Sequence, residues 1–223
     1  MLGDLLPAAL GIALSPPPII AVVVLLGTPR ARITGPAFAF GWILGLAAVV
    51  AVASLVFDDA EKQDSAASVA ASLLKVACGA LFLFLAVKQW RKRPPTRANS
   101  DEPEMPKWLA SIETMTAPRA LALGAGLSGA NPKNLALTLA AAASVAETGL
   151  DGTSTTIVVA AFVMLCSVIT VGAVLFHLAA PERASTHFAT IKQFMADHGA
   201  VMTTVILLLL GAKLLGDGIS GLL

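Results

Sequence analysis

The chain has 223 residues, of which 57% are hydrophobic and 13% are charged, and its formal net charge is +1. An average soluble domain carries about 25% charged residues and has no core large enough to hide this much apolar surface. These values exclude an ordinary soluble enzyme, a disordered chain and a polybasic nucleic-acid-binding protein. Cys78 and Cys166 both lie within apolar runs, so we expect neither a disulfide framework nor a zinc site.

Six apolar stretches are each long enough to cross a membrane as a helix, which needs about 20 residues. In chain order they are residues 5–26, 36–57, 66–87, 120–146, 155–178 and 199–219. The first is not typical of a signal peptide, because it lacks a basic start and contains three consecutive prolines. All six are too long for strands and lack the alternation of strands. The sequence therefore predicts an all-α polytopic membrane protein with six transmembrane helices.

Lysine and arginine are distributed unequally between the two sides of the predicted membrane. The loops that follow spans one, three and five hold eleven of these residues, whereas the opposite loops hold only Lys62. The eleven are Arg30, Arg32, Lys88, Arg91, Lys92, Arg93, Arg97, Lys107, Arg119, Arg183 and Lys192. Because basic loops stay in the cytoplasm, we expect both termini to lie outside it.

The predicted spans divide the chain into three parts. Residues 1–90 form a first three-helix repeat, residues 91–118 a cytoplasmic linker, and residues 119–223 a second three-helix repeat. Residues 105–116 and 182–197 carry apolar side chains at helical spacing, which favours helices that lie along the membrane surface. For the segment 105–116, a solvated linker is an equally good interpretation.

The two halves share a short sequence pattern. Residues 9–15 in span one and residues 122–128 in span four have five of seven amino acids in common. A helix-breaking stretch follows each copy: three prolines in the first half, and Asn131-Pro132 in the second. Each half holds an odd number of spans, so the second half is inverted relative to the first. Paired broken spans in inverted halves point to a transport site near the membrane midplane, whereas simple proline kinks are the alternative.

Polar residues at the two breaks are the candidate substrate site. Proline removes a backbone donor, and the freed carbonyl groups need partners in protein, water or ligand. Lys133 and the positive end of the helix that follows favour an anion; alternatively, Lys133 snorkels or bonds the freed carbonyl groups. Lys75, in the middle of span three, is a second candidate, unless it pairs with a carboxylate. The predicted substrate-binding residues are Ser15, Pro16, Pro17, Pro18, Lys75, Ser128, Asn131, Pro132, Lys133 and Asn134.

Lys88 and Lys213 occupy matched positions near the ends of spans three and six. Each either snorkels to the headgroups or guards a mouth of an anion pathway, and Asp217 is spaced to pair with Lys213. The six apolar cores hold no carboxylate clearly at mid-membrane, which favours an anionic or amphiphilic substrate over a cationic amino acid. The sequence has no catalytic triad, nucleotide-binding loop or metal-spaced cluster. We therefore expect no enzymatic activity, no cofactor and no metal.

Three short motifs resemble those of a known family: residues 15–18 (SPPP), 28–32 (TPRAR) and 131–134 (NPKN). The chain resembles, over essentially its whole length, the GAP family of glycopeptidolipid- or sulfolipid-addressing proteins. That family belongs to the lysine-exporter (LysE) superfamily of six-span transporters. The resemblance implies a multi-pass protein of the bacterial inner (plasma) membrane that helps to move envelope lipids outward. It carries over no catalytic residue.

These observations favour a transporter that moves an anionic or amphiphilic envelope lipid by alternating access, as a flippase or exporter does. The alternatives are a LysE-type exporter of an amino acid or ion, and a non-transporting accessory subunit of a larger lipid exporter. The expected partners are membrane lipids and an anionic lipid or small-molecule substrate, with no nucleic acid. Gly41 and Gly45 permit close helix packing, either within the chain or in a homodimer; a larger lipid-export machinery is the other candidate protein partner.

Overall fold

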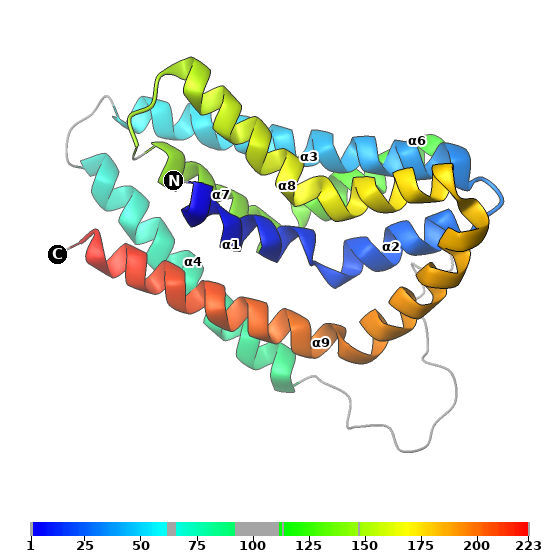
Figure 1. Cartoon of the computed structure of the whole chain (residues 1–223). Coiled ribbons are helices and arrows are strands. Elements are labelled where there is room, and N and C mark those ends of the chain that lie inside the picture. The colour runs from blue at the N-terminus through cyan, green and yellow to red at the C-terminus, as the bar shows by residue number, and fades with distance from the viewer. Residues whose placement is uncertain (1, 62–65, 92–111, 113, 147, 223) are drawn as a thin grey trace.

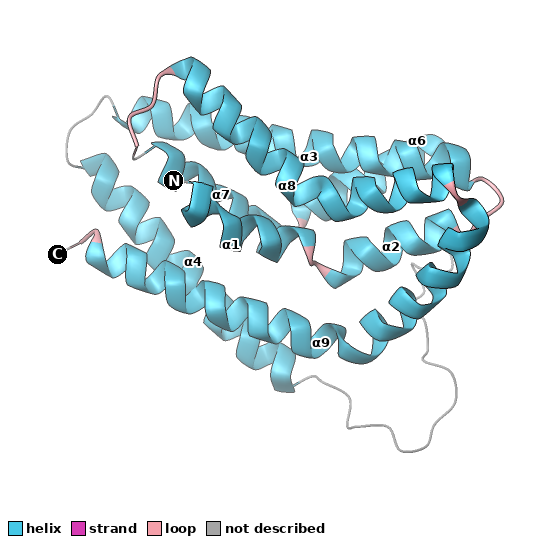
Figure 2. Cartoon of the chain, in the orientation of Figure 1, coloured by secondary structure: helices cyan, strands magenta, loops and turns pink. Residues whose placement is uncertain are grey.

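The computed structural model describes residues 2–61, 66–91, 112, 114–146 and 148–222, and every regular element among them is a helix (Figure 2). The helices are α1 (Leu2–Ala13), α2 (Pro16–Leu26), α3 (Ala31–Glu61), α4 (Ala66–Arg91), α6 (Ala117–Ala125), the π-helix η1 (Gly126–Ala130), α7 (Pro132–Ala146), α8 (Gly152–Ala179) and α9 (Pro181–Ser220). The all-helical prediction is confirmed for these residues. The segment 105–116, predicted as a surface helix or a linker, lies mostly outside them.

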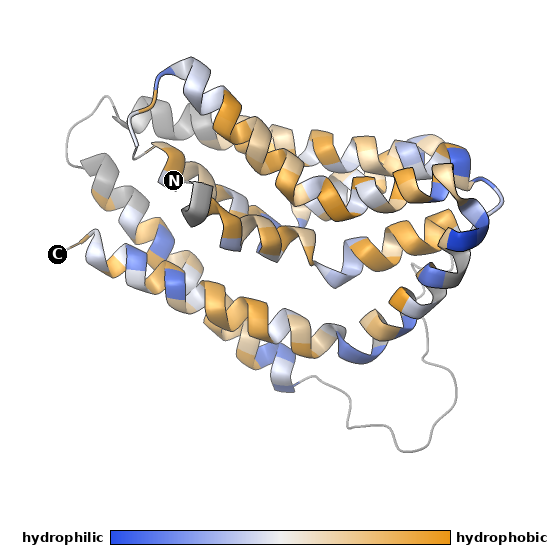
Figure 3. Ribbon diagram, in the orientation of Figure 1, coloured by the Kyte–Doolittle hydropathy of each residue, from blue (hydrophilic) through white to orange (hydrophobic). Residues whose placement is uncertain are grey.

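Four of the described helices, α3, α4, α8 and α9, are long and apolar enough to cross a membrane. α1 and α2 meet at a bend of 43° and make a fifth candidate when they are taken as one broken span. These helices consist mostly of hydrophobic residues (Figure 3), and several large apolar side chains are exposed; Ile33, Phe84, Met164 and Leu209, for example, are 64% to 68% exposed. Such surfaces suit lipid rather than water, so the chain is a membrane protein. The predicted fourth span, divided into α6, η1 and α7, is not among these candidates.

The broken segments occupy the middle of the molecule. Figure 1 shows α3, α6 and α8 on one side, α4 and α9 on the other, and α1, α2 and α7 between them. The contacts agree with this view, because α1 packs against α7 and α8, α2 against α8 and α9, and α7 against α3 and α4. Both termini lie at the same end of the bundle. The first interrupted segment and α7 of the second are therefore surrounded by the other helices.

Glycines set the two closest helix contacts. A methyl group at Gly41 of α3 would come within 2.0 Å of the Leu121 carbonyl oxygen of α6. A methyl group at Gly79 of α4 would come within 2.9 Å of the Gly211 carbonyl oxygen of α9. Only glycine permits backbones to approach this closely. Gly41 and Gly45, predicted to favour close packing, both contact the α6–η1 segment of the same chain.

Some helices extend beyond the predicted spans. α3 begins five residues before and ends four residues after the predicted span 36–57. α9 runs without interruption through the predicted surface segment 182–197 and the predicted span 199–219. Its first turns run across the end of the bundle before it follows α4 (Figure 1). Polar residues had marked the separators in the sequence, but polarity alone does not end a helix, and α3 continues through Pro36.

The start of α8 is fixed by a helix cap. The Asp151 carboxylate accepts hydrogen bonds from the backbone amides of Thr153 at 3.1 Å and Ser154 at 3.3 Å. Side-chain and backbone hydrogen bonds from Ser154 hold the pKa of this carboxyl below its ordinary value. The charged form of Asp151 is therefore favoured by folding, as expected at the positive end of a helix.

We expect Gly41→Ala to lower the free energy of unfolding by about 1–3 kcal/mol, because the added methyl group overlaps the backbone of α6. The matched control is Gly172→Ala in α8, where nothing lies within 4 Å of an added methyl group. Alanine is the better helix former, so this control should retain or raise the stability. Thermal unfolding in detergent measures both variants. Equal melting temperatures for the two would contradict the close α3–α6 contact.

The Asp151 cap predicts a pH dependence. A carboxyl whose pKa is lowered by folding stabilises the native state above its unfolded pKa, and this contribution disappears as the pH falls through the folded value. Asn also caps helices but carries no charge. The difference in melting temperature between the wild type and Asp151→Asn should therefore shrink as the pH falls below 3.8, the ordinary pKa of the group. A difference that stays constant down to pH 2 would contradict the lowered pKa.

Candidate functional site

The two helix breaks have nearly the same backbone geometry. Ser15, between α1 and α2, has φ −68° and ψ 117°. Asn131, between η1 and α7, has φ −72° and ψ 118°. A proline follows each residue and begins the next helix, as expected because proline keeps the preceding residue out of the helical region. The predicted breaks are thus confirmed, at Ser15 and at Asn131.

The two breaks do not fall at the same place in the shared sequence pattern. The sequence pattern aligns Ser15 with Ser128, whereas the residue that shares the backbone angles of Ser15 is Asn131, because the second copy of the pattern ends within the π-helix η1, which continues to Ala130. Ser128 is buried, and its hydroxyl donates to the Ala125 carbonyl oxygen at 3.1 Å. Its Oγ also lies where a methyl group at Gly45 would be. Ser128 therefore packs η1 against α3.

Lys133 joins the two breaks. Its ammonium is buried and donates to the Gly11 carbonyl oxygen of α1 at 2.7 Å. That carbonyl has lost its helical donor, because the Ser15 amide donates to Ile12 instead. Of the two roles predicted for Lys133, this conformation shows the one in which the ammonium bonds a freed carbonyl group. The first break supplies the acceptor and the second break supplies the cation.

The two asparagines of the second break also bond the backbone. The Asn131 Oδ1 accepts from the Lys133 amide at 3.1 Å and so caps the first turn of α7. The Asn134 Nδ2 donates to the Leu127 carbonyl oxygen in η1 at 3.0 Å. These contacts satisfy groups that the interruption exposes. A direct role of either asparagine in binding a substrate stays a prediction.

Near this break, three buried polar atoms in the described part of the chain have no hydrogen-bond partner. They are the Asn134 Oδ1, the Thr138 Oγ1 one turn further along α7, and the Trp42 Nε1 on α3, which packs against α7. Each of the three side chains is at most 1% exposed. The sequence analysis missed Thr138 and Trp42. The spacing of four residues between Asn134 and Thr138, which places both on one face of a helix, is the signal that would have found Thr138.

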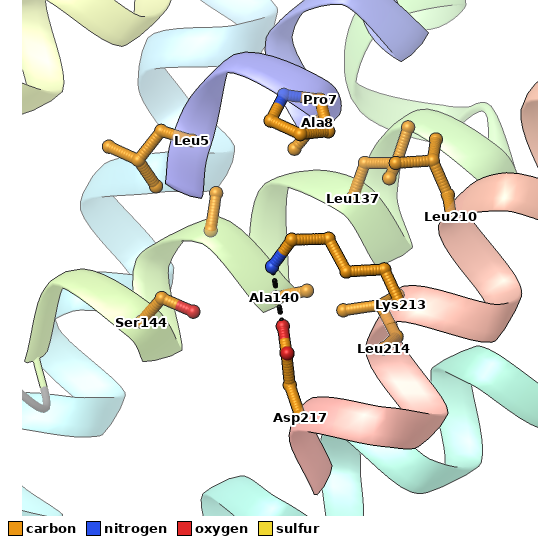
Figure 4. A pocket seen from close by; sticks show the side chains of 11 residues that line it. Leu5, Pro7, Ala8, Leu137, Ala140, Ser144, Leu210, Lys213, Leu214 and Asp217 are labelled. Carbon is orange, nitrogen blue, oxygen red and sulfur yellow. Dashed lines mark hydrogen bonds and ion pairs between the residues drawn. The ribbon is translucent and has the colours of Figure 1, made fainter. Parts of the chain in front are cut away.

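A small cavity lies between α1, α7 and α9 (Figure 4). It has room on the order of one water molecule. Its lining includes Leu137, which follows Lys133 by one turn, and Leu210 of α9. A methyl group at Gly11 would lie 3.1 Å from the first of these side chains and 2.7 Å from the second. The side chains of Leu137 and Leu210 therefore adjoin both the cavity and Gly11, whose carbonyl oxygen bonds Lys133.

An ion pair lines the same cavity. The Lys213 Nζ lies 2.6 Å from the Asp217 Oδ2, as the spacing of the two residues predicted. Figure 4 shows the lysine side chain reaching across the cavity from α9 toward α7. The two side chains are 38% and 43% exposed. The rest of the lining is apolar apart from Ser144 on α7.

The remaining predicted residues are spread over the structure. Lys75 is buried in α4 and is engaged in an interaction within the protein, so it is no free cation. Lys88 is exposed in the last turn of α4 and does not line the cavity. Ser15 is buried at the start of α2, but its side chain does not cap that helix. The prolines of the breaks divide into two sets, buried Pro16 and Pro18 and exposed Pro17 and Pro132.

A comparison with protein families gives one match. Residues 5–220 match the profile of the family SfLAP, described as Sap, sulfolipid-1-addressing protein. The match covers both breaks, the Gly11–Lys133 bond and the cavity. No curated protein and no solved structure matches the chain.

The polar contacts of α7 predict opposite effects for two substitutions. Asn134→Leu leaves the Leu127 carbonyl oxygen, the acceptor of a part-buried hydrogen bond, without this donor, so we expect it to lower the free energy of unfolding by about 1–3 kcal/mol. Thr138→Val has nearly the same shape and removes a buried hydroxyl without a partner, so the stability should stay constant or rise. Thermal unfolding of both variants in detergent is the measurement. A loss in Thr138→Val as large as that in Asn134→Leu would show that the hydroxyl has a partner.

Proposed function

Since the chain belongs to the SfLAP family of sulfolipid-1-addressing proteins, we propose that it moves an anionic envelope lipid across the bacterial inner membrane. The lipid headgroup binds near the membrane midplane, where the two breaks meet. The acyl chains remain in the bilayer during transfer. The protein acts as a transporter of the flippase or exporter kind and performs no chemical reaction on the lipid.

The observation that carries this proposal is the position of the Lys133 ammonium. A buried cation in a membrane protein is costly, and such residues usually lie on a substrate pathway. The bond to Gly11 uses one of the three hydrogen-bond donors of an ammonium group. Sulfate or phosphate oxygens of a headgroup are suitable acceptors for the other two. The positive end of α7 adds to the attraction for an anion.

The helix contacts support two inverted repeats, in which α1–α4 correspond to α6–α9. The contact of α1 with α8 then has its counterpart in the contact of α6 with α3. The contact of α2 with α9 corresponds to that of α7 with α4, and the contact of α3 with α7 to that of α8 with α2. In this arrangement α6, η1 and α7 together form a broken fourth span. The total is then six spans, with the midplane site between the repeats.

Alternating access then proceeds by exchange at the Gly11–Lys133 bond. An anionic headgroup takes the place of the Gly11 carbonyl oxygen at the ammonium, which releases α1 from α7. Residues near the start of α1 and the end of α9 line the cavity between these helices, and both termini lie at that end of the bundle (Figure 1). The distribution of basic residues supports assigning that end to the outer side of the membrane.

Reconstitution tests the proposal. Vesicles of phosphatidylcholine contain the protein and a tail-labelled fluorescent sulfatide, and dithionite quenching reports movement between leaflets, with and without an imposed pH gradient. We expect the wild type to accelerate the movement of sulfatide between leaflets but not that of tail-labelled phosphatidylcholine. Lys133→Gln should slow sulfatide at least tenfold, because a charge-assisted hydrogen bond contributes about 1.5–3 kcal/mol. The matched control is Arg91→Gln, which removes an exposed charge at the end of α4 and should leave the rate unchanged.

Other outcomes would overturn the proposal in defined ways. An unchanged rate in Lys133→Gln would remove the midplane cation from the mechanism. Transport of free sulfate or an amino acid without any lipid movement would favour a small-solute exporter. Lipid movement that requires an added membrane extract would favour an accessory subunit.

A further inference from the structure

Two residues of opposite charge line the cavity between α1, α7 and α9. The Lys213–Asp217 pair lines the cavity with no net charge, whereas Lys133, one turn before the lining residue Leu137 on α7, has no carboxylate among its hydrogen bonds within the described chain. We propose that this pair is a charge filter on the headgroup pathway, with Lys213 as the transient anion-binding residue and Asp217 as the group that limits its attraction. This inference rests on the proposed function and adds the specificity-determining residues to it.

The exposure of the pair permits exchange with a ligand. Both side chains are partly exposed, so a headgroup reaches them without first crossing an apolar layer. An ion pair in such surroundings contributes little to stability. A sulfate or phosphate oxygen can therefore replace the Asp217 carboxylate at the Lys213 ammonium at low cost. The exchange makes and breaks ionic hydrogen bonds only and changes no covalent bond.

The two residues of this pair determine the electrostatic field in the cavity, because the remaining lining is uncharged. Apart from Ser144, the other residues around the cavity are apolar. Removing either charge therefore changes the net charge of the lining by a full unit. Asp217→Asn leaves Lys213 unopposed and attracts anions, whereas Lys213→Gln leaves Asp217 unopposed and repels them. The double variant restores neutrality.

The rate at which charged reagents label a cysteine in the cavity measures this electrostatic field, and the measurement does not require transport. Ser144→Cys places a thiol on the α7 wall of the cavity, in a background where the two buried native cysteines, Cys78 and Cys166, are replaced by alanine. The probes are two methanethiosulfonates, one with a sulfonate group and one with a trimethylammonium group. Their rate ratio cancels differences in thiol reactivity. The thermal stability of each variant confirms that it is folded.

We expect the anionic-to-cationic rate ratio to rise in Asp217→Asn and to fall in Lys213→Gln, each by roughly tenfold. One unit charge a few ångströms away in a water-like medium changes the rate of each probe by about threefold, in opposite directions for the two probes. The double variant should return to the wild-type ratio, and high salt should reduce all differences. An unchanged ratio, or a shift in the same direction in both single variants, would overturn the filter and leave a simple helix-surface ion pair.

A second arm identifies the source of the anion. In phosphatidylcholine vesicles, addition of sulfatide to the bilayer should slow labelling of the cysteine at position 144 by at least threefold, whereas inorganic sulfate at the same total concentration should not. Protection by inorganic sulfate alone would overturn the assignment to a lipid headgroup. The two proposals remain separable: a chain without lipid transfer can still show the charge-dependent labelling, and a transporting chain with unaffected labelling loses only the filter.

Discussion

A backbone carbonyl group that loses its helical donor inside a membrane has no water to bond, and this constraint organises the centre of the molecule. The Gly11 oxygen is such a group, and the Lys133 ammonium is a buried cation that equally needs a partner. Each satisfies the other across 122 positions of sequence. The same requirement explains why Asn134 reaches back to Leu127 over the π-helix. The breaks are therefore stable parts of a packed core, held in place by their own exposed groups.

Under the proposed function, the same constraint indicates where a substrate acts. A ligand that offers a stronger acceptor than a neutral carbonyl group competes directly with the bond between α1 and α7. Anionic oxygens are such acceptors. Binding and loosening of the helix contact are then one event, which is the differential interaction that any ligand-driven change of conformation requires.

Local sequence signals predicted the breaks, whereas contacts between residues far apart in the chain could not be predicted from the sequence. Proline after Ser15 and after Asn131 restricts the backbone in a way that neighbouring residues alone decide, and the structure contains both breaks. The choice of Gly11 as the partner of Lys133 depends on how α1 packs against α7. The same holds for Thr138 and Trp42, whose burial follows from packing rather than from local pattern. The Lys213–Asp217 pair was predictable because helical spacing alone brings the two side chains together.

The glycine contacts have a consequence for how the bundle can deform. Gly41 ties α3 to α6, and Gly79 ties α4 to α9, with backbones too close to slide without collision. Each pair joins one helix from the first half of the chain to one from the second. Rocking of the two halves as intact blocks would therefore have to separate both of these close contacts. Shear is left to the segments between those pairs, α1, α2 and α7, which hold the two breaks.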